Sequence, residues 1–282
     1  AQLWFLGRVS HPVFLNGDLP WAPSAIRPDQ HVHAPSGERL DCVTPHEMSR
    51  QDIRVAIEDL ANGAKNAMDV GFDGVQVHGA NGYIIDQFLR DGANQRSDEY
   101  GGSVANRLRF MRESVAACCD VAGEGRVAVR LSPLNPYNDM RDSNPAALFA
   151  EAAAALNEFP LSFLEIVEGL PGHFLHAPGG PVLPEIRRRY QGVLIANGGY
   201  QFENAAAAVE AGDVDGVSFG VPFISNPDLV DRFRRDAPLA APDAETFYTA
   251  GEKGYLDYPT YDEKPESGAA YQGLQLEDAR KH

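Results

Sequence analysis

Three side chains that could bind and protonate a carbonyl compound lie within one short segment, His78-Gly-Ala-Asn-Gly-Tyr83. His78 and Asn81 can donate hydrogen bonds as neutral groups, and Tyr83 carries a phenol. The segment follows the Val-Gln-Val pattern of residues 75–77, which indicates the end of a strand. A rigid scaffold could therefore direct all three side chains toward one small molecule.

The scaffold is predicted by short apolar runs that alternate with segments of helical period. Six runs are typical of buried parallel strands, at residues 2–6, 74–78, 127–131, 163–167, 193–196 and 216–219. Helical periodicity covers residues 50–68, 108–122, 146–156, 183–190, 203–211 and 228–235, and Ser49 is a suitable N-cap for the first helix. Strict alternation of strand and helix predicts a parallel sheet with right-handed crossovers.

Polar residues at the strand ends favour a barrel over an open sheet. His78, Arg130, Glu168 and Asn197 end four different strands. A TIM barrel builds its site from many strand ends, whereas an open doubly wound sheet uses one switch point. We therefore predict an α/β TIM barrel over residues 1–261 and a polar C-terminal tail over residues 262–282.

The sequence shows only about six of the eight strand-helix units of such a barrel. The two others would precede Gln2, so we expect an upstream segment, a second chain or a swapped partner in a homodimer to supply them. Without them, the sheet would have two unpaired edges. The Pro-rich segment of residues 20–45 is expected to cross the barrel mouth as a long functional loop.

The composition indicates a globular protein with a small-molecule partner. Hydrophobic residues make up 44% of the 282 residues, which can form a large core, and no apolar run is long enough to span a membrane. The net charge of -16 argues against nucleic acid and anionic membranes, because both require a basic face. Cys42, Cys118 and Cys119 lack the spacing of a disulfide framework or zinc site, which favours a reducing cytoplasm and predicts no metal.

Five ordered segments together resemble the old yellow enzyme family of FMN-dependent ene-reductases. The resemblance includes the His78 to Tyr83 segment and extends from residue 2 to about residue 261. The other segments are Gln2-Leu-Trp-Phe-Leu-Gly-Arg8, Gln95-Arg-Ser-Asp-Glu-Tyr-Gly-Gly-Ser103 with Asn106-Arg107, Phe223-Ile-Ser-Asn-Pro-Asp-Leu229 and Gly254-Tyr-Leu-Asp-Tyr-Pro259. Several motifs in order are more specific than any single glycine-rich loop.

The resemblance implies a reaction in which FMN is reduced by NADPH or NADH and passes a hydride to an activated alkene. His78 and Asn81 would bind the substrate's carbonyl or nitro oxygen, where negative charge grows in the transition state. Tyr83 would protonate the α-carbon, because a phenol with a pKa near 10 remains protonated at neutral pH.

The resemblance also assigns residues to the cofactor and to the pocket. Arg130 would face the anionic ring of the reduced flavin; its alternative is an ion pair with Glu165 or Glu168. Gln2 would bind the pyrimidine edge, and its alternative is a capping role. The phosphate would lie at Gly198, Gly199, Phe219 and Gly220, and the pocket would include Trp4, Phe247 and Tyr248.

Two residues depart from the family pattern. Val221 stands where the family has an arginine that pairs with the phosphate, and a charge-assisted bond contributes about 1.5 to 3 kcal/mol. Phe5 stands where the family has histidine. Val221 keeps open a flavin-free isomerase or cyclase on the same scaffold. An inactive paralogue is the third alternative. It is disfavoured because His78, Asn81, Tyr83 and Arg130 are all present.

Overall fold

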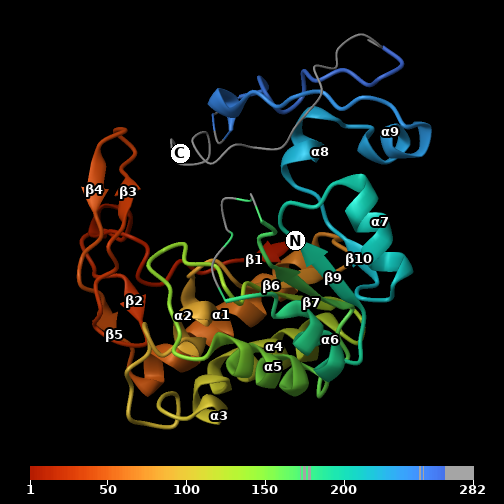
Figure 1. Cartoon of the computed structure of the whole chain (residues 1–282). Coiled ribbons are helices and arrows are strands. Elements are labelled where there is room, and N and C mark those ends of the chain that lie inside the picture. Colours follow the sequence, from red (N-terminus) through yellow and green to blue (C-terminus); the bar gives the residue numbers. More distant parts are fainter. Residues whose placement is uncertain (172, 174–175, 177–178, 248, 250, 264–282) are drawn as a thin grey trace.

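Six parallel strands form the central sheet of the protein, and their order in space follows their order in the chain. The computed structural model describes residues 1–171, 173, 176, 179–247, 249 and 251–263 (Figure 1). Sequential order of parallel strands is the arrangement of a TIM barrel, whereas a doubly wound sheet reverses direction. The strands are β1 (Gln2–Leu3), β6 (Val75–Gly79), β7 (Val127–Leu131), β8 (Phe163–Val167), β9 (Leu194–Asn197) and β10 (Gly216–Val217).

Two of the predicted strands are shorter than expected. The run at residues 2–6 is a strand only at Gln2–Leu3, and that at residues 216–219 only at Gly216–Val217. The chain leaves the sheet after Leu3, and the carbonyl of Phe5 instead accepts a hydrogen bond from the N–H of Ile84 (3.1 Å). Among the described residues β1 pairs only with β6 and β10 only with β9.

The six predicted helices are present, with ends that differ by at most one residue. The first has the capping box expected of Ser49, whose Oγ accepts from the N–H of Asp52 (3.2 Å) while the Asp52 carboxylate accepts from the N–H of Ser49 (2.7 Å). The helices are α1 (Arg50–Asp69), α4 (Arg109–Ala122), α5 (Pro145–Leu156), α6 (Leu183–Arg189), α7 (Phe202–Glu210) and α9 (Leu229–Arg235).

Several short elements were not predicted, because they have too few residues for a periodic pattern. The segment of residues 20–45, expected as one long loop, contains the antiparallel pair β3 (His31–His33) and β4 (Arg39–Asp41), which projects from the body in Figure 1. The other unpredicted elements are β2 (Trp21–Ala22), β5 (His46–Glu47), α2 (Ile84–Leu89), α3 (Val104–Arg107), α8 (Val221–Ser225) and the 3-10 helices at Pro12–Phe14 and Ala244–Thr246.

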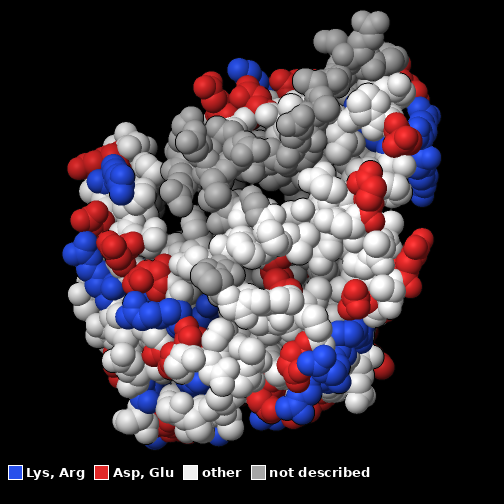
Figure 2. Space-filling view, in the orientation of Figure 1, with Lys and Arg blue, Asp and Glu red and all other residues white. Residues whose placement is uncertain are grey.

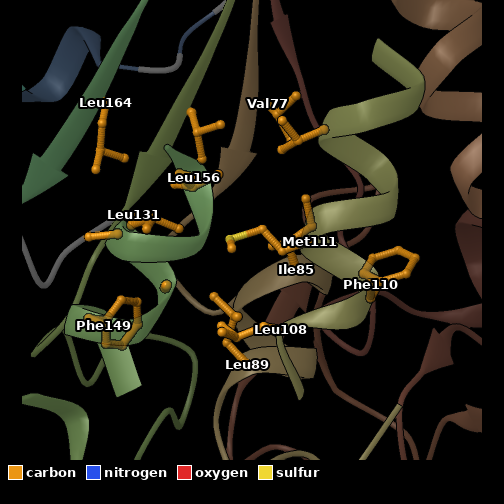
Figure 3. Packing of buried hydrophobic residues seen from close by; sticks show 14 of the residues in the cluster. Val77, Ile85, Leu89, Leu108, Phe110, Met111, Leu131, Phe149, Leu156 and Leu164 are labelled. Carbon is orange, nitrogen blue, oxygen red and sulfur yellow. The ribbon is translucent and has the colours of Figure 1, made fainter. Parts of the chain in front are cut away.

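The apolar core lies between the sheet and its helices, including α1 and α6, and Figure 3 shows the part against α2, α4 and α5. Val77, Leu131 and Leu164 extend from neighbouring strands β6, β7 and β8 and are fully buried. The helices contribute Ile85, Leu89, Phe110, Met111, Phe149 and Leu156. This packing fixes the strands, so side chains at their carboxyl ends have defined positions. Cys118 belongs to this core, and burial raises the pKa of its thiol to about 12.

Basic side chains on the surface lie beside acidic ones, as the face in Figure 2 shows. The three consecutive arginines of α6 are an example: Arg187 pairs with Asp215 (2.8 Å), Arg188 with Glu185, and Arg189 with Glu151. In the part of the chain that the structure describes, no helix is both long enough and apolar enough to traverse a bilayer.

Candidate active site

Three aromatic rings meet at the carboxyl end of β6. The ring of Trp4 lies 4.8 Å from that of Tyr83 and 6.2 Å from that of His78, both in edge-to-face geometry. The rings of His78 and Tyr83 are 5.4 Å apart. Tyr83 is the N-cap residue of α2, and His78 lies in β6, so a strand and a helix start hold the group. The structure thus brings together three of the residues predicted for catalysis and the pocket.

His78 is held as a neutral imidazole. Burial, with a smaller contribution from the charge of Arg130, lowers the pKa of His78 to about 4. The imidazole is therefore uncharged at neutral pH and keeps one N–H to donate. Its Nδ1 is buried and has no hydrogen-bond partner among the described residues. A buried polar atom without a partner is costly, and a ligand acceptor would remove that cost.

Asn81 has a left-handed backbone (φ 57°) that later parts of the chain hold in place. Its N–H donates to Oγ of Ser132 (2.7 Å), and its carbonyl accepts from Nδ2 of Asn138 (2.8 Å). Its side-chain oxygen accepts from Nδ2 of Asn135 (2.7 Å). With the oxygen engaged, the carboxamide nitrogen is the group that remains to donate to a substrate.

The residues that hold Asn81 belong to the 132–140 loop, which follows β7. Gly82 packs directly against this loop: a Cβ at Gly82 would lie 2.6 Å from Cβ of Asn138, and its φ is 77°. Arg8 fixes the loop from the other side, since its Nη2 donates to the carbonyls of Asn138 (3.3 Å) and Asp139 (2.9 Å). Arg8 is almost fully buried, and burial lowers its pKa.

A polar layer crosses the sheet next to this group, and it contains two of the predicted cofactor residues. Nε2 of Gln2 donates to Oε1 of Gln76 (2.6 Å), its register partner in β6. Arg130 donates through Nη2 to Oδ1 of Asn197 (2.9 Å), while its buried Nε has no partner among the described residues. The capping alternative for Gln2 is not what the structure shows, because Gln2 bonds to a side chain within the sheet.

The alternative considered for Arg130, an ion pair, is present with one of the two candidates. Nη1 of Arg130 lies 3.4 Å from Oε2 of Glu165. Glu168 has a different role: its carboxylate accepts from the N–H groups of Val182 and Leu183 (3.1 Å) at the start of α6. Arg130 therefore has an acidic neighbour, but its Nε has no partner among the described residues. The ion pair does not use all the donors of Arg130, and a ligand could accept from Nε.

The predicted phosphate residues lie at the carboxyl ends of the neighbouring strands β9 and β10. Gly198 and Gly199 have φ of 115° and 88°, and a Cβ at Gly198 would lie 3.0 Å from the carbonyl oxygen of Glu168. Around Gly220, by contrast, a Cβ would meet no described atom within 4 Å. The ring of Phe219 packs edge-to-face on Phe233 (5.2 Å), so only its backbone could serve an anion. No cationic side chain starts α8, where Val221 is the first residue.

The remaining pocket predictions have separate outcomes. Trp4 borders both the aromatic group and a cavity of about 540 Å³ whose lining includes Phe5, Phe14 and Trp21. Trp4 is 55% exposed and is not part of the apolar core. Phe247 is half-buried after the 3-10 helix Ala244–Thr246, and its part in the pocket stays a prediction. Tyr248 lies outside the described residues.

Sequence reasoning missed the residues that orient the site. Ser132, Asn135 and Asn138 hold Asn81, and Gln76 orients Gln2. One signal was available for Gln76, because it is the polar residue between Val75 and Val77 in an otherwise apolar strand. No periodic signal marks Asn135 or Asn138, which lie in irregular backbone.

The sequence matches the family described as NADH:flavin oxidoreductase / NADH oxidase over residues 1–240. A protein from Leishmania infantum named "Probable flavin mononucleotide-dependent alkene reductase" is 45% identical over 242 residues, which are 84% of this chain and 65% of that protein. The 12-oxophytodienoate reductase 7 of Oryza sativa subsp. japonica is 39% identical over 277 residues, covering 92% of this chain and 70% of the relative.

Solved structures give the same result for the fold. The old yellow enzyme homologue from Zymomonas mobilis has a TM-score of 0.89 and 40% identity, over 92% of this chain and 73% of that one. Morphinone reductase in complex with tetrahydroNAD has a TM-score of 0.85 and 38% identity, over 92% and 71%. These neighbours confirm the predicted TIM-barrel class. The chain spans 65% of the length of the Leishmania relative and 73% of the Zymomonas structure.

Proposed function

We propose that this chain, which belongs to the NADH:flavin oxidoreductase / NADH oxidase family, binds FMN and reduces alkenes conjugated to a carbonyl or nitro group. NADPH or NADH would be the reductant. The alkene reductase and 12-oxophytodienoate reductase named among its relatives support this substrate class, and the neighbour solved with tetrahydroNAD supports a nicotinamide reductant.

The residues present fit FMN on two observations. The buried Nε of Arg130 is a cationic donor without a described partner, and Arg130 is connected through Glu165 and Gln76 to Gln2, whose amide suits a polar ring edge. At the ends of β9 and β10, Gly199 and Gly220 are exposed, and no described atom lies within 4 Å of a Cβ placed at Gly220. Gln2 and Arg130 would hold the ring, and backbone N–H groups of Gly198, Gly199, Phe219 and Gly220 would hold the phosphate.

Bound FMN would supply the two-electron chemistry, by taking electrons from the nicotinamide and giving them to the alkene. His78 and Asn81 would donate hydrogen bonds to the substrate oxygen, which gains negative charge as the double bond is reduced. Because His78 is neutral and Asn81 is fixed by Asn135, both donors are in place before the substrate binds. This preorganisation lowers the barrier without a later rearrangement.

Tyr83 would supply the proton to the α-carbon. Its ring is placed by contacts with Trp4 and His78, and its backbone by the start of α2. A phenol is a suitable acid here, since it stays protonated at neutral pH until a strongly basic carbon develops beside it. We also propose a reducing compartment such as the cytoplasm, because the three cysteines are unpaired and two of them are buried.

The single observation that carries the proposal is the convergence of His78, Tyr83 and Trp4 beside the polar layer of Gln2 and Arg130. An absorbance spectrum tests it. We expect a yellow protein after reconstitution with FMN, which bleaches with NADPH under anaerobic conditions and regains its colour when an enone is added. A chain that binds no FMN would overturn the proposal and favour the flavin-free isomerase or cyclase that Val221 suggests.

A further inference from the structure

A closed ring of polar contacts joins four side chains of the layer that contains Arg130. Arg130 donates to Oδ1 of Asn197 (2.9 Å), and Nδ2 of Asn197 donates to Oγ of Ser218 (3.0 Å). Ser218 in turn donates its hydroxyl to Oε1 of Glu165, and Oε2 of Glu165 lies 3.4 Å from Nη1 of Arg130. The guanidinium therefore cannot shift without losing Glu165 or Asn197.

Glu165 is the buried acidic member of this ring. Its side chain is 6% exposed, whereas that of Arg130 is 23% exposed. A carboxylate this close offsets much of the positive charge that Arg130 presents to a ligand, because the low-dielectric surroundings screen the pair weakly.

Glu165 also determines which way two glutamine side chains point. Its Oε2 accepts from Nε2 of Gln76 (2.8 Å), and an ionised carboxylate can only accept. Gln76 must therefore direct its nitrogen to Glu165 and its oxygen to Gln2, which donates to it through Nε2 (2.6 Å). Gln2 is left with its oxygen available, and this atom has no donor among the described residues. This orientation follows from the donor count and not from the assignment of amide atoms.

We propose that Glu165 is a positioning residue that sets the charge and hydrogen-bond polarity of the flavin-facing layer. Because its negative charge offsets the positive charge of Arg130, Glu165 lowers the affinity of these residues for reduced FMN, which is more negative, relative to oxidised FMN. Through Gln76, it presents the oxygen of Gln2 to an N–H donor, such as the imide N–H on the pyrimidine edge of FMN. The inference rests on the proposed function, because it takes FMN to be the ligand of this layer.

The first experiment separates charge from packing in the FMN-reconstituted full chain. Glu165→Gln keeps the size of the side chain and removes its charge, so Arg130 should hold reduced FMN more tightly relative to oxidised FMN. We expect a change of about tenfold in that ratio, which is a two-electron midpoint potential about 30 mV more positive. Glu151→Gln is the matched control, because it makes the same change of charge at an exposed ion pair with Arg189, outside this ring. Its potential should equal that of the wild type.

A second variant tests the orientation of Gln2 without altering charge. Gln76→Met keeps the length of the side chain but can neither donate to Glu165 nor accept from Gln2. We expect oxidised FMN to bind about tenfold more weakly, as judged by quenching of FMN fluorescence, with an unchanged midpoint potential. This variant also keeps the inference testable if Glu165→Gln does not fold.

The outcomes separate this inference from the proposed function. If the wild-type chain binds FMN and reduces an enone, but Glu165→Gln has an unchanged or more negative potential, only the role of Glu165 in setting charge is overturned. Unchanged FMN affinity in Gln76→Met overturns its role in orienting Gln2. If the wild-type chain binds no FMN, the proposed function and this inference both fail.

Discussion

The two ends of the candidate site are built by different means. At the end that contains His78, Asn81 and Tyr83, side chains carry the chemistry, and hydrogen bonds from the 132–140 loop fix their positions. At the other end, Gly198, Gly199 and Gly220 offer only backbone, and no cation begins α8. The first end offers donors on side chains that are fixed in place, whereas the second end offers a ligand mainly backbone N–H groups.

This difference teaches where the binding free energy and the rate enhancement would arise. Fixed donors at the first end can stabilise charge that develops during the reaction. Backbone N–H groups at the second end can hold a phosphate but add no formal charge of their own. We therefore expect mutations at the first end to affect rate and stability, and mutations at the second end to affect cofactor affinity.

The largest effect is expected from Tyr83→Phe. Without the phenol, re-oxidation of the reduced enzyme by an enone should slow by about 10² to 10⁴-fold, the usual contribution of a general acid. Reduction by NADPH should be nearly unchanged, because it needs no proton from Tyr83. Stopped-flow measurement of the two half-reactions distinguishes them, with the exposed Tyr255→Phe as control. Equal slowing of both half-reactions would show that Tyr83 acts by shaping the site.

The next effect concerns pH and the neutral state of His78. Its pKa is about 4 in the folded protein against 6.5 for the free side chain, so the unfolded chain binds more protons between these values. Stability from this residue is complete above pH 6.5 and falls by about 3 kcal/mol as the pH drops to 4.

Urea denaturation between pH 4.5 and 7.5 measures this loss. In His78→Leu the fall in unfolding free energy across this range should be smaller, whereas the exposed His33→Gln should behave like the wild type. If His78→Leu shows the full wild-type dependence, then the imidazole is not held neutral, and the first end is less organised than we describe.

A pair of glycine substitutions compares the two ends directly. Gly82→Ala places a Cβ 2.6 Å from Asn138 at a φ of 77°, and we expect a loss of about 1 to 3 kcal/mol in unfolding free energy. Gly220→Ala meets no described atom and should change stability by less than about 0.5 kcal/mol while weakening FMN. Thermal unfolding and FMN titration of both variants test this. Equal FMN affinity in Gly220→Ala and the wild type would remove Gly220 from the phosphate site.

The smallest effect is a gain of function at the second end. Val221→Arg adds a cation at the start of α8, and we expect FMN to bind about tenfold more tightly, with the gain declining as salt increases. Val230→Arg, at an exposed position of α9, is the control for a general effect of charge. Unchanged affinity in Val221→Arg would place the phosphate away from α8.

The sequence predicted the buried strands and the longer helices, but not the strand ends or the residues that orient the site. The runs at residues 127–131 and 163–167 are strands with the predicted bounds, because both are buried and apolar enough to be distinct. The run at residues 2–6 was predicted too long, since strand length depends on where the partner ends. Asn135 could not be identified at all, because its role depends on a contact with Asn81 in another part of the chain.

The contacts of the 132–140 loop carry a consequence for enzyme engineering. Loops after barrel strands are natural targets for exchange between relatives when a new substrate range is wanted. Here such an exchange would remove the side-chain partners of Asn81, and a loop with a different backbone path would also leave the buried guanidinium of Arg8 without two of its carbonyl acceptors. The smallest unit that could be transplanted with its function intact therefore includes Arg8, the turn at Asn81 and the loop together.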